Sequence, residues 1–307
     1  MIVCCGDALI DMLPSVSQAG RPVLAPHPGG ALFNTSIALG RLGIPVEFFN
    51  GLSQDLFGAQ LRAALAASNV GLRYAHVSAR PTTLAFAHVV EGQATYTFYD
   101  EGTAARMLNE AELPALDDEV TAMLFGAVSL TAEPCGSAFE ALMHREAKKR
   151  VMMLDPNIRP DCITDRDAYL ARFRRMLAKA DIVKLSDEDL AWFGEAGGAE
   201  ESVERWLERG PKLVIVTRGS KGAIGYTQRF SVAAEPPRVT VVDTVGAGDT
   251  FNAGVLASLH GQGALDKRAI ANLTHEAVMD VLNLGIRAAA VTVSRAGADP
   301  PWKHELA

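Results

Sequence analysis

Short apolar runs alternate along the chain with segments in which apolar residues recur at helical spacing. In the first part of the chain, buried strands are predicted at residues 1–5, 8–10 and 46–50. Helices are predicted at residues 34–42 and 57–67. A strand followed by a helix, repeated in this way, indicates the start of a parallel sheet covered by helices.

The pattern changes at residues 82–99, where apolar and polar residues alternate along two short runs. A turn is predicted at Glu91-Gly92-Gln93 between them, so this stretch is interpreted as a β-hairpin inserted into an α/β chain. An inserted hairpin of this kind is typical of a small lid. We expect lid segments at about residues 11–28 and 80–105.

After about residue 120 the strand and helix order returns. Further strands are predicted at residues 122–128, 151–154, 182–185, 213–217 and 291–293, and a second hairpin at 223–242. We therefore expect one α/β domain over residues 1–307, with a doubly wound, mostly parallel sheet and helices on both faces. In such sheets, ligands bind at the carboxyl ends of the strands.

Composition excludes several classes of protein. The 307 residues are 49% hydrophobic and 21% charged, which allows a sizeable core. A formal net charge of −7 argues against a nucleic-acid partner. No apolar segment approaches the ~18 residues of a membrane span, and no signal peptide is recognised. The four cysteines lack metal-ligand spacing, so we expect reduced thiols and a cytoplasmic protein.

The strongest chemical signal is the small-residue run from Asp243 to Gly254, which leads directly into a helical pattern. Small residues at a helix N-terminus let backbone N–H groups approach an anion closely. Asp249 follows Gly246-Ala247-Gly248 and could accept the proton of an attacking hydroxyl during phosphoryl transfer. From the residues alone, Asp249 could equally be an N-cap and the glycines only a turn.

Two stretches carry a resemblance to a known family. Asp243 to Phe251 resembles the C-terminal signature of the ribokinase-like (PfkB-type) carbohydrate kinases, and Gly29-Gly30-Ala31-Leu32-Phe33-Asn34 resembles their N-terminal signature. The resemblance covers essentially the whole chain. It implies that Asp249 is the catalytic base and that Gly246, Ala247 and Gly248 hold the developing charge. It also implies that the sugar contacts Asp11, Gly30, Asn34 and Asp249.

The same resemblance implies an ATP site. Thr217-Arg218-Gly219-Ser220-Lys221-Gly222 is similar to the family's nucleotide loop, so ATP is expected to lie against Thr217, Gly219, Gly222, Gly246 and Gly248. No Walker-type phosphate loop occurs in the sequence. The stretch from Asp155 to Arg159 resembles a segment of fructokinase-like and ketodeoxygluconate kinase-like members, in which Arg159 could hold a substrate carboxylate, a phosphate or the transferring phosphoryl group.

Metal ions are implied at two places. Ser186 and Asp189 stand where many members carry the Asn and Glu that organise Mg²⁺, and both differ from that pattern. A monovalent cation such as K⁺, which activates some members, would meet a set of five residues at corresponding positions: Asp243, Val245, Thr292, Arg295 and Gly297. Pro301 stands where a ligand Ser would be, which weakens the expectation of a potassium site.

The resemblance favours an ATP-dependent sugar kinase, with bacterial fructokinases most similar around residues 80–86, 96–99 and 183–190. A 2-keto-3-deoxygluconate kinase is the alternative, followed by a ribose, nucleoside or other polyol kinase. A dinucleotide dehydrogenase would need Gly-x-Gly-x-x-Gly after the first strand, and the sequence lacks it. A non-catalytic sugar-binding relative would be expected to lose Asp249. Lid hairpins in the family often pair between subunits, so we expect a homodimer.

Overall fold

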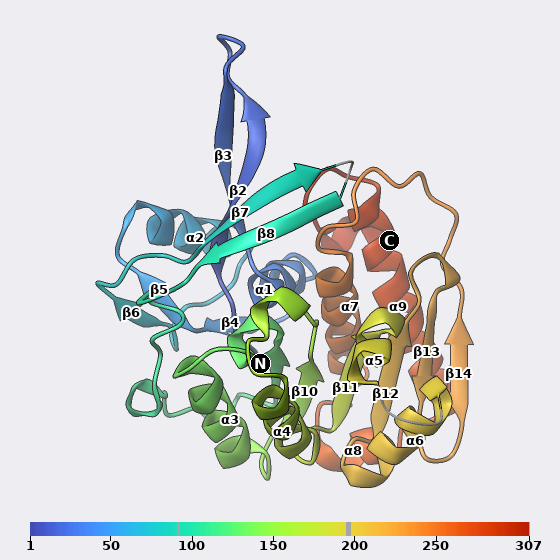
Figure 1. Cartoon of the computed structure of the whole chain (residues 1–307). Coiled ribbons are helices and arrows are strands. Elements are labelled where there is room, and N and C mark those ends of the chain that lie inside the picture. The colour runs from blue at the N-terminus through green and yellow to red at the C-terminus, as the bar shows by residue number, and fades with distance from the viewer. Residues whose placement is uncertain (91–92, 195–197, 307) are drawn as a thin grey trace.

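A sheet of eight strands runs through the middle of the molecule, in a computed structural model that describes residues 1–90, 93–194 and 198–306 (Figure 1). The strand order is β14 (Ser231–Ala234), β13 (Ala223–Tyr226), β12 (Leu213–Thr217), β11 (Ile182–Ser186), β10 (Val151–Asp155), β9 (Ala122–Gly126), β1 (Ile2–Cys5) and β4 (Val46–Phe49). Six neighbouring strands of this sheet are parallel: β12, β11, β10, β9, β1 and β4. The hairpin β13–β14 adds two antiparallel strands at the β12 edge. The predicted hairpin at residues 223–242 is therefore present over its first half.

Helices cover both faces of this sheet, as the sequence predicted. The core on one face includes residues of α1 (Ala31–Arg41), α2 (Leu56–Ala67), α7 (Ala247–Gly261), α8 (Lys267–Ala271) and α9 (His275–Val293). The core on the other face includes residues of α3 (Cys135–Glu146), α4 (Arg166–Leu177), α5 (Asp187–Phe193) and α6 (Gly198–Arg209). Short 3-10 turns are η1 (Glu110–Glu112), η2 (Ala127–Leu130), η3 (Pro160–Cys162), η4 (Gly219–Lys221) and η5 (Lys303–Leu306).

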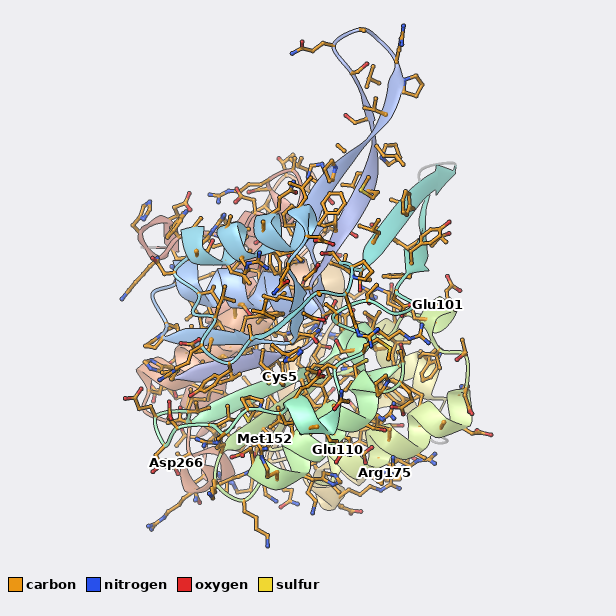
Figure 2. All side chains as sticks on the ribbon, turned by 90° about the vertical axis from the view of Figure 1, so that its left-hand side faces the viewer. Cys5, Glu101, Glu110, Met152, Arg175 and Asp266 are labelled. Atoms are coloured by element: carbon orange, nitrogen blue, oxygen red, sulfur yellow. The ribbon has the colours of Figure 1, made fainter. Side chains whose placement is uncertain are left out.

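Strand β1 shows why the parallel strands are continuous apolar runs. Ile2 and Cys4 pack into the core on the α7 face, whereas Val3 and Cys5 pack into the core on the α3 face. Because successive side chains of a strand point to opposite faces, a sheet covered on both sides needs apolar residues at every position. Figure 2 shows Cys5 and Met152 inside these layers and Arg175 near the periphery.

A second sheet stands over one side of the first. It has the order β3 (Pro22–Gly29), β2 (Leu9–Val16), β7 (Leu84–Val90) and β8 (Gln93–Tyr99). Both views show the β2–β3 hairpin projecting away from the α/β body (Figures 1 and 2). The predicted hairpin of residues 82–99 is present as β7–β8, and residues 91–92 of its predicted turn lie outside the described residues. A short pair, β5 (Gly51–Ser53) and β6 (His76–Ser78), completes the strands.

The predicted strand at residues 291–293 is wrong. These residues are the last turn of α9, and the Thr292 hydroxyl donates to the carbonyl of Ala288 one turn earlier, at 3.3 Å. A three-residue apolar run has no period of its own, so helix and strand cannot be separated by pattern there. The preceding alanines favour continuation of the helix.

No helix in residues 1–90, 93–194 or 198–306 combines the length and apolar character that a membrane span requires.

Candidate active site

The small-residue loop forms the N-terminus of helix α7. Gly246 is the N-cap with φ of 75°, a left-handed conformation that glycine adopts without strain. A Cβ on Gly246 would also lie 2.7 Å from the Cβ of Ala298, so a side chain is excluded there. The first N–H groups of a helix have no intrahelical acceptor, and they point out of its positive end. This end of α7 can therefore hold an anion.

Asp249 lies in the first turn of α7 and is 7% exposed. The Asn34 amide donates to its Oδ2 at 2.9 Å, and no donor in the described part of the chain hydrogen-bonds Oδ1. Burial raises the pKa of Asp249 to about 7, against the opposing effects of the Asn34 hydrogen bond and the Lys184 charge; Asp155 and Asp7 add to the increase. A carboxyl group with this pKa can exchange a proton near neutral pH.

The Gly29-Gly30 turn brings the start of α1 against the end of β1. Gly30 has φ of 118°, and a Cβ there would lie 2.6 Å from the carbonyl oxygen of Asp7. The Asp7 carboxylate accepts from the backbone N–H of Ala31 at 2.8 Å, so it caps α1 from a distant segment. This cap explains why α1 begins at Ala31, three residues before the predicted start, and it places Asn34 on the first turns.

Asp11 lies on β2 beside this turn, and its carboxylate packs against Gly29. Burial, together with the negative charge of Asp7, raises the pKa of Asp11 to about 6. The negative charge of Asp7 acts to raise the pKa of both Asp11 and Asp249. Arg159 lies close enough for its charge to oppose the effect of burial on Asp7.

A buried lysine points toward the anion-binding end of α7. Lys184 is 4% exposed, and its Nζ donates to Asp155 Oδ2 at 3.1 Å. The Asn252 amide donates to the same oxygen at 2.6 Å. A Cβ on Gly248 would lie 3.1 Å from Lys184 Nζ, so the ammonium group sits beside the backbone of the first turn of α7.

The stretch predicted to bind ATP follows strand β12. Thr217 ends this strand and pairs in register with Ser186, the last residue of β11, so both lie at the carboxyl edge of the sheet. The chain then turns through η4, and the Arg218 N–H donates to the Gly222 carbonyl at 2.8 Å. The turn exposes backbone at the same edge of the sheet from which β1 and β10 lead into Asp7 and Arg159.

Ser186 and Asp189 form a capping box at the start of α5. The Ser186 hydroxyl accepts from the Asp189 N–H at 3.0 Å, and Asp189 Oδ2 accepts from the Ser186 N–H at 3.0 Å. Asp189 Oδ1 accepts from the Ile158 N–H at 2.9 Å. Both carboxylate oxygens thus already have donors, and the described residues contain no cluster of three or more His, Cys, Asp or Glu arranged to hold a metal ion.

The five residues named for a monovalent cation lie in two segments that the structure brings together. Asp243 Oδ1 accepts from the Val245 N–H at 3.0 Å and Oδ2 from the Gly297 N–H at 2.9 Å. Thr292 is fully buried and its hydroxyl contacts that of Thr250 at 2.9 Å. Arg295 makes an ion pair with Glu305 at 2.5 Å. The two segments are adjacent, and the cation itself stays a prediction.

The comparison with known sequences decides the family. The pattern of the pfkB family carbohydrate kinases matches residues 1–305. The chain belongs to this family. A fructokinase of Rhizobium leguminosarum bv. trifolii is 54% identical over 278 residues, covering 91% of this chain and 85% of that protein. A fructokinase of Salmonella typhimurium is 35% identical over 264 residues, covering 84% of each chain.

A solved structure supports the same assignment. The crystal structure of a fructokinase with bound ATP from Xylella fastidiosa superposes with a TM-score of 0.91 at 26% identity, covering 99% of this chain and 97% of that one. This pfkB-family chain is therefore an ATP-dependent carbohydrate kinase with an α/β, mostly parallel sheet, as the sequence predicted.

Within this kinase, the residues predicted for the sugar do lie together. Asn34 contacts Asp249, and Asp11 lies by the Gly29-Gly30 turn. Sequence reasoning missed Asp7, Lys184 and Asn252. Lys184 had a readable signal, because a lysine inside an apolar strand must be buried with a partner. Asp7 directly follows the first strand, at the edge where ligands bind.

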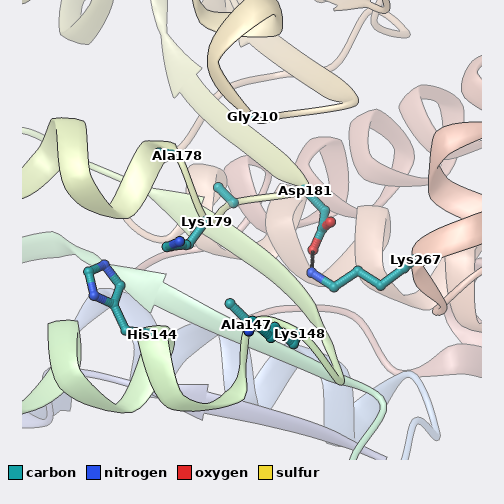
Figure 3. A pocket seen from close by; sticks show the side chains of 9 residues that line it. His144, Ala147, Lys148, Ala178, Lys179, Asp181, Gly210 and Lys267 are labelled. Atoms are coloured by element: carbon teal, nitrogen blue, oxygen red, sulfur yellow. Dashed lines mark hydrogen bonds and ion pairs between the residues drawn. The ribbon is translucent and has the colours of Figure 1, made fainter.

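A hollow lies at the edge of the kinase's main sheet opposite to these residues (Figure 3). It is lined by basic side chains around the Lys267–Asp181 ion pair of 2.5 Å, including His144, Lys148 and Lys179. His144 lies in the last turn of α3, and Lys148 and Lys179 follow the ends of α3 and α4. Cations are stabilised at such C-terminal ends, so this basic lining needs no ligand to explain it.

Proposed function

We propose that this protein is a fructokinase, which converts D-fructose and ATP into fructose 6-phosphate and ADP. The observation that carries the proposal is the buried Asp249 at the anion-binding end of α7, with one oxygen held by Asn34 and the other without a donor in the described chain. The identity of 54% to a fructokinase over 91% of the chain favours fructose over other sugars.

In the proposed reaction, Asp249 accepts the proton of the 6-hydroxyl as the hydroxyl oxygen attacks the γ-phosphorus. The new O–P bond forms, the bond between the γ-phosphorus and the β–γ bridging oxygen breaks, and ADP leaves with that electron pair. The backbone of Gly246, Ala247 and Gly248 stabilises the negative charge of the phosphoryl group in transit. A base with a pKa of about 7 suits this role, because it is substantially ionised at neutral pH and still basic.

Fructose is proposed to bind between the second sheet and the start of α1. Asp11 and Asn34 hydrogen-bond sugar hydroxyls, since a carboxylate accepts and a carboxamide both donates and accepts. Gly30 allows the close approach of the sugar at the turn. Arg159 contacts the sugar from the side of β10. A missing hydroxyl would leave these polar groups unpaired, which is how such a site discriminates between sugars.

ATP is proposed to lie along the carboxyl edge of β11 and β12. Thr217, Gly219 and Gly222 line its phosphates and ribose, and Gly246 and Gly248 meet the terminal phosphate. ATP enters as its Mg²⁺ complex, in which the metal neutralises phosphate charge. Ser186 and Asp189 remain the predicted residues near that metal, but the donors already on both Asp189 oxygens do not fit direct coordination, so no step is assigned to them.

The second sheet is proposed to act as a lid. Its strands β7 and β8, with β2 and β3, cover the sugar and exclude water, which would otherwise compete as phosphoryl acceptor.

The projecting β2–β3 hairpin exposes Val16, Val23 and Leu24, and we propose that a second copy of the chain covers them in a homodimer. Light scattering of the wild type and of Leu24→Asp tests this: a monomeric wild type would rule it out.

Two further assignments are proposals. The protein works in the cytoplasm, which the free state of Cys4, Cys5, Cys135 and Cys162 supports.

A potassium ion binds between the loop of Asp243 and Val245 and the segment of Thr292, Arg295 and Gly297. The hydrogen bond from the Gly297 N–H to Asp243 joins the loop to the segment. Activity in K⁺ compared with a tetramethylammonium salt tests this second proposal.

The test of the proposed function is an ADP-release assay with fructose, mannose, ribose, 2-keto-3-deoxygluconate and adenosine at equal concentrations. We expect the highest kcat/KM with fructose. A higher value with 2-keto-3-deoxygluconate would replace fructose by the keto acid and assign Arg159 to its carboxylate. No ADP release above the sugar-free rate with any acceptor would mean a non-catalytic relative.

A further inference from the structure

The buried Lys184, Asp155 and Asn252 form a polar network in the core of the kinase, on the face of the sheet that α7 covers. Val183 and Leu185 belong to the core on the opposite face, so Lys184 between them points toward α7. Asp155 ends the neighbouring strand β10, and Asn252 lies on α7 itself. The three residues thus join two strands to the helix whose N-terminus holds the anion site.

This network is incomplete in the protein alone. A lysine ammonium group has three N–H donors, and within the described residues only Asp155 Oδ2 accepts one of them. The Oδ1 atom of Asn252 is buried and has no hydrogen-bond partner. Buried polar groups are nearly always paired, so unpaired ones call for an explanation. The unused Lys184 donors lie beside Gly248, where a negatively charged group would complete them.

Stability alone explains this arrangement poorly. Taking a lysine and an aspartate out of water is unfavourable, and apolar residues of similar volume often serve the fold as well. The position beside the first turn of α7 gives the charge a second use. Preorganised donors and cations aimed at the place where charge develops are usually the largest single contribution to catalysis.

We propose that Lys184 is a further catalytic residue, whose ammonium group binds an oxygen of the γ-phosphoryl group as that group moves from ATP to the sugar hydroxyl. Asp155 is a positioning residue that orients the ammonium group, and Asn252 fixes Asp155. The inference rests on the proposed kinase reaction. It adds to the backbone anion site a full positive charge that is already in place before ATP arrives.

Lys184 also acts on Asp249 through its charge, which lowers the pKa of that carboxyl group. The other groups facing Asp249 are Asn34 on α1, Asp155 at the end of β10 and Asp7 after β1. Replacing Lys184 by a neutral residue removes a positive charge and leaves the negative charges of Asp155 and Asp7 in place, so Asp249 should hold its proton to higher pH. The kcat profile would then rise at higher pH than in the wild type, a change that a lysine remote from Asp249 would not cause.

The test compares Lys184→Met with Lys267→Met. Lys267 is the matched control, because it pairs with Asp181 at the opposite edge of the same sheet (Figure 3). With the wild type's best sugar, we expect kcat of Lys184→Met to fall about 10²–10³-fold with sugar KM changed less than about threefold, and the acid limb to shift upward. Lys267→Met should keep both kcat and the profile.

A second variant guards against misfolding, since Lys184→Met leaves Asp155 buried without its counter-charge. Lys184→Gln combined with Asp155→Asn keeps a polar pair and removes both charges. If this folded variant, judged by its melting temperature, retained kcat within about threefold of wild type, the proposal would be overturned. A fall in kcat of about 10²-fold or more in it supports the proposal.

Nucleotide binding separates this inference from the proposed function. A lysine at the γ-phosphoryl group should favour ATP over ADP, so Lys184→Met should weaken binding of a non-hydrolysable ATP analogue about tenfold or more and leave ADP binding within about twofold. This comparison needs no sugar and is readable even if the wild type phosphorylates none. Equal losses for both nucleotides would contradict the assignment to the transferring group.

Discussion

The side chains of Asn34 and Asp249 are 215 positions apart in sequence and meet at 2.9 Å, where the amide of Asn34 donates to one carboxylate oxygen of Asp249. The contact joins the two signature stretches of the family, one at the start of α1 and the other at the start of α7. It leaves the second carboxylate oxygen without a donor among the described residues, and our proposal assigns that oxygen to the sugar hydroxyl. The hydrogen bond also favours the charged form of Asp249. The ionised carboxylate accepts hydrogen bonds at both oxygens, whereas the protonated group carries an O–H donor at one of them.

Removing this hydrogen bond should move the pH profile. In Asn34→Ala, the charged form of Asp249 loses a partner worth about 1.5–3 kcal/mol, so its pKa should rise by about one to two units. The acid limb of kcat against pH should shift upward by that amount. Asn272→Ala, at the exposed end of α8, is the control and should leave the profile in place. If the acid limb did not move in Asn34→Ala, the acid limb would not report the ionisation of Asp249.

The buried Asp249 should also lower stability at alkaline pH. Its folded pKa of about 7 is above its unfolded value near 3.8, so ionisation opposes folding increasingly as pH rises from 4 to 7. Asp249→Asn removes this cost. The melting temperature of Asp249→Asn minus that of wild type should therefore be larger at pH 8 than at pH 5. A difference that does not change between the two pH values would show that Asp249 is not a buried group of raised pKa.

The crossing of α7 and α9 rests on two glycines. A Cβ on Gly254 would lie 2.6 Å from the Cα of Gly285, so the two helix backbones are in contact. Gly254→Ala should destabilise the protein by about 1–3 kcal/mol in urea unfolding, because the helices must separate. Gly261→Ala in the same helix has open space and should be neutral or stabilise by up to about 1 kcal/mol. Equal changes in the free energy of unfolding for Gly254→Ala and Gly261→Ala would show that α7 and α9 do not pack closely at Gly254.

Asp55 ties the base of the second sheet to α2. Its carboxylate accepts from the Gly58 N–H at 2.7 Å, as the N-cap of α2, and from the Thr82 N–H at 2.8 Å, just before β7. Although partial burial acts to raise it, the hydrogen bonds from Thr82, Gly58 and Ser53 hold the pKa of Asp55 below its usual value.

Asp55→Ala should therefore lower the free energy of unfolding by about 1–2 kcal/mol at pH 7. Because the folded pKa of Asp55 is depressed, its contribution is present above about pH 4 and is lost as pH falls through the folded value. The gap between wild type and Asp55→Ala in urea unfolding should thus narrow below pH 4. A gap that stays constant down to pH 3 would contradict the role of the ionised carboxylate.

The layered fold was predictable because each parallel strand is buried on both faces and must be apolar throughout. The strand Ile182–Ser186 shows the limit of that rule, since its Lys184 is buried with Asp155 from a different strand. No local pattern reveals a partner 29 positions away. The error at residues 291–293 has another cause: the last turn of a buried helix and a short buried strand have the same apolar composition.

Pairing across the chain was the least predictable part of the site. The glycines before Asn34 and Asp249 indicated tight turns, but not that the two turns face each other. Asp7 caps α1 from 24 positions earlier, outside any local capping motif. The resemblance to the family supplied the pairing that periodicity could not.

The central claim is that Asp249 is the base that deprotonates the sugar, and one measurement tests it most directly. Asp249→Asn and wild type are compared for kcat in the ADP-release assay at pH 8, with fructose binding followed by calorimetry. We predict that kcat falls about 10²–10⁴-fold in Asp249→Asn while fructose still binds within about tenfold of wild type. A kcat within a few-fold of wild type in the folded variant would contradict the account.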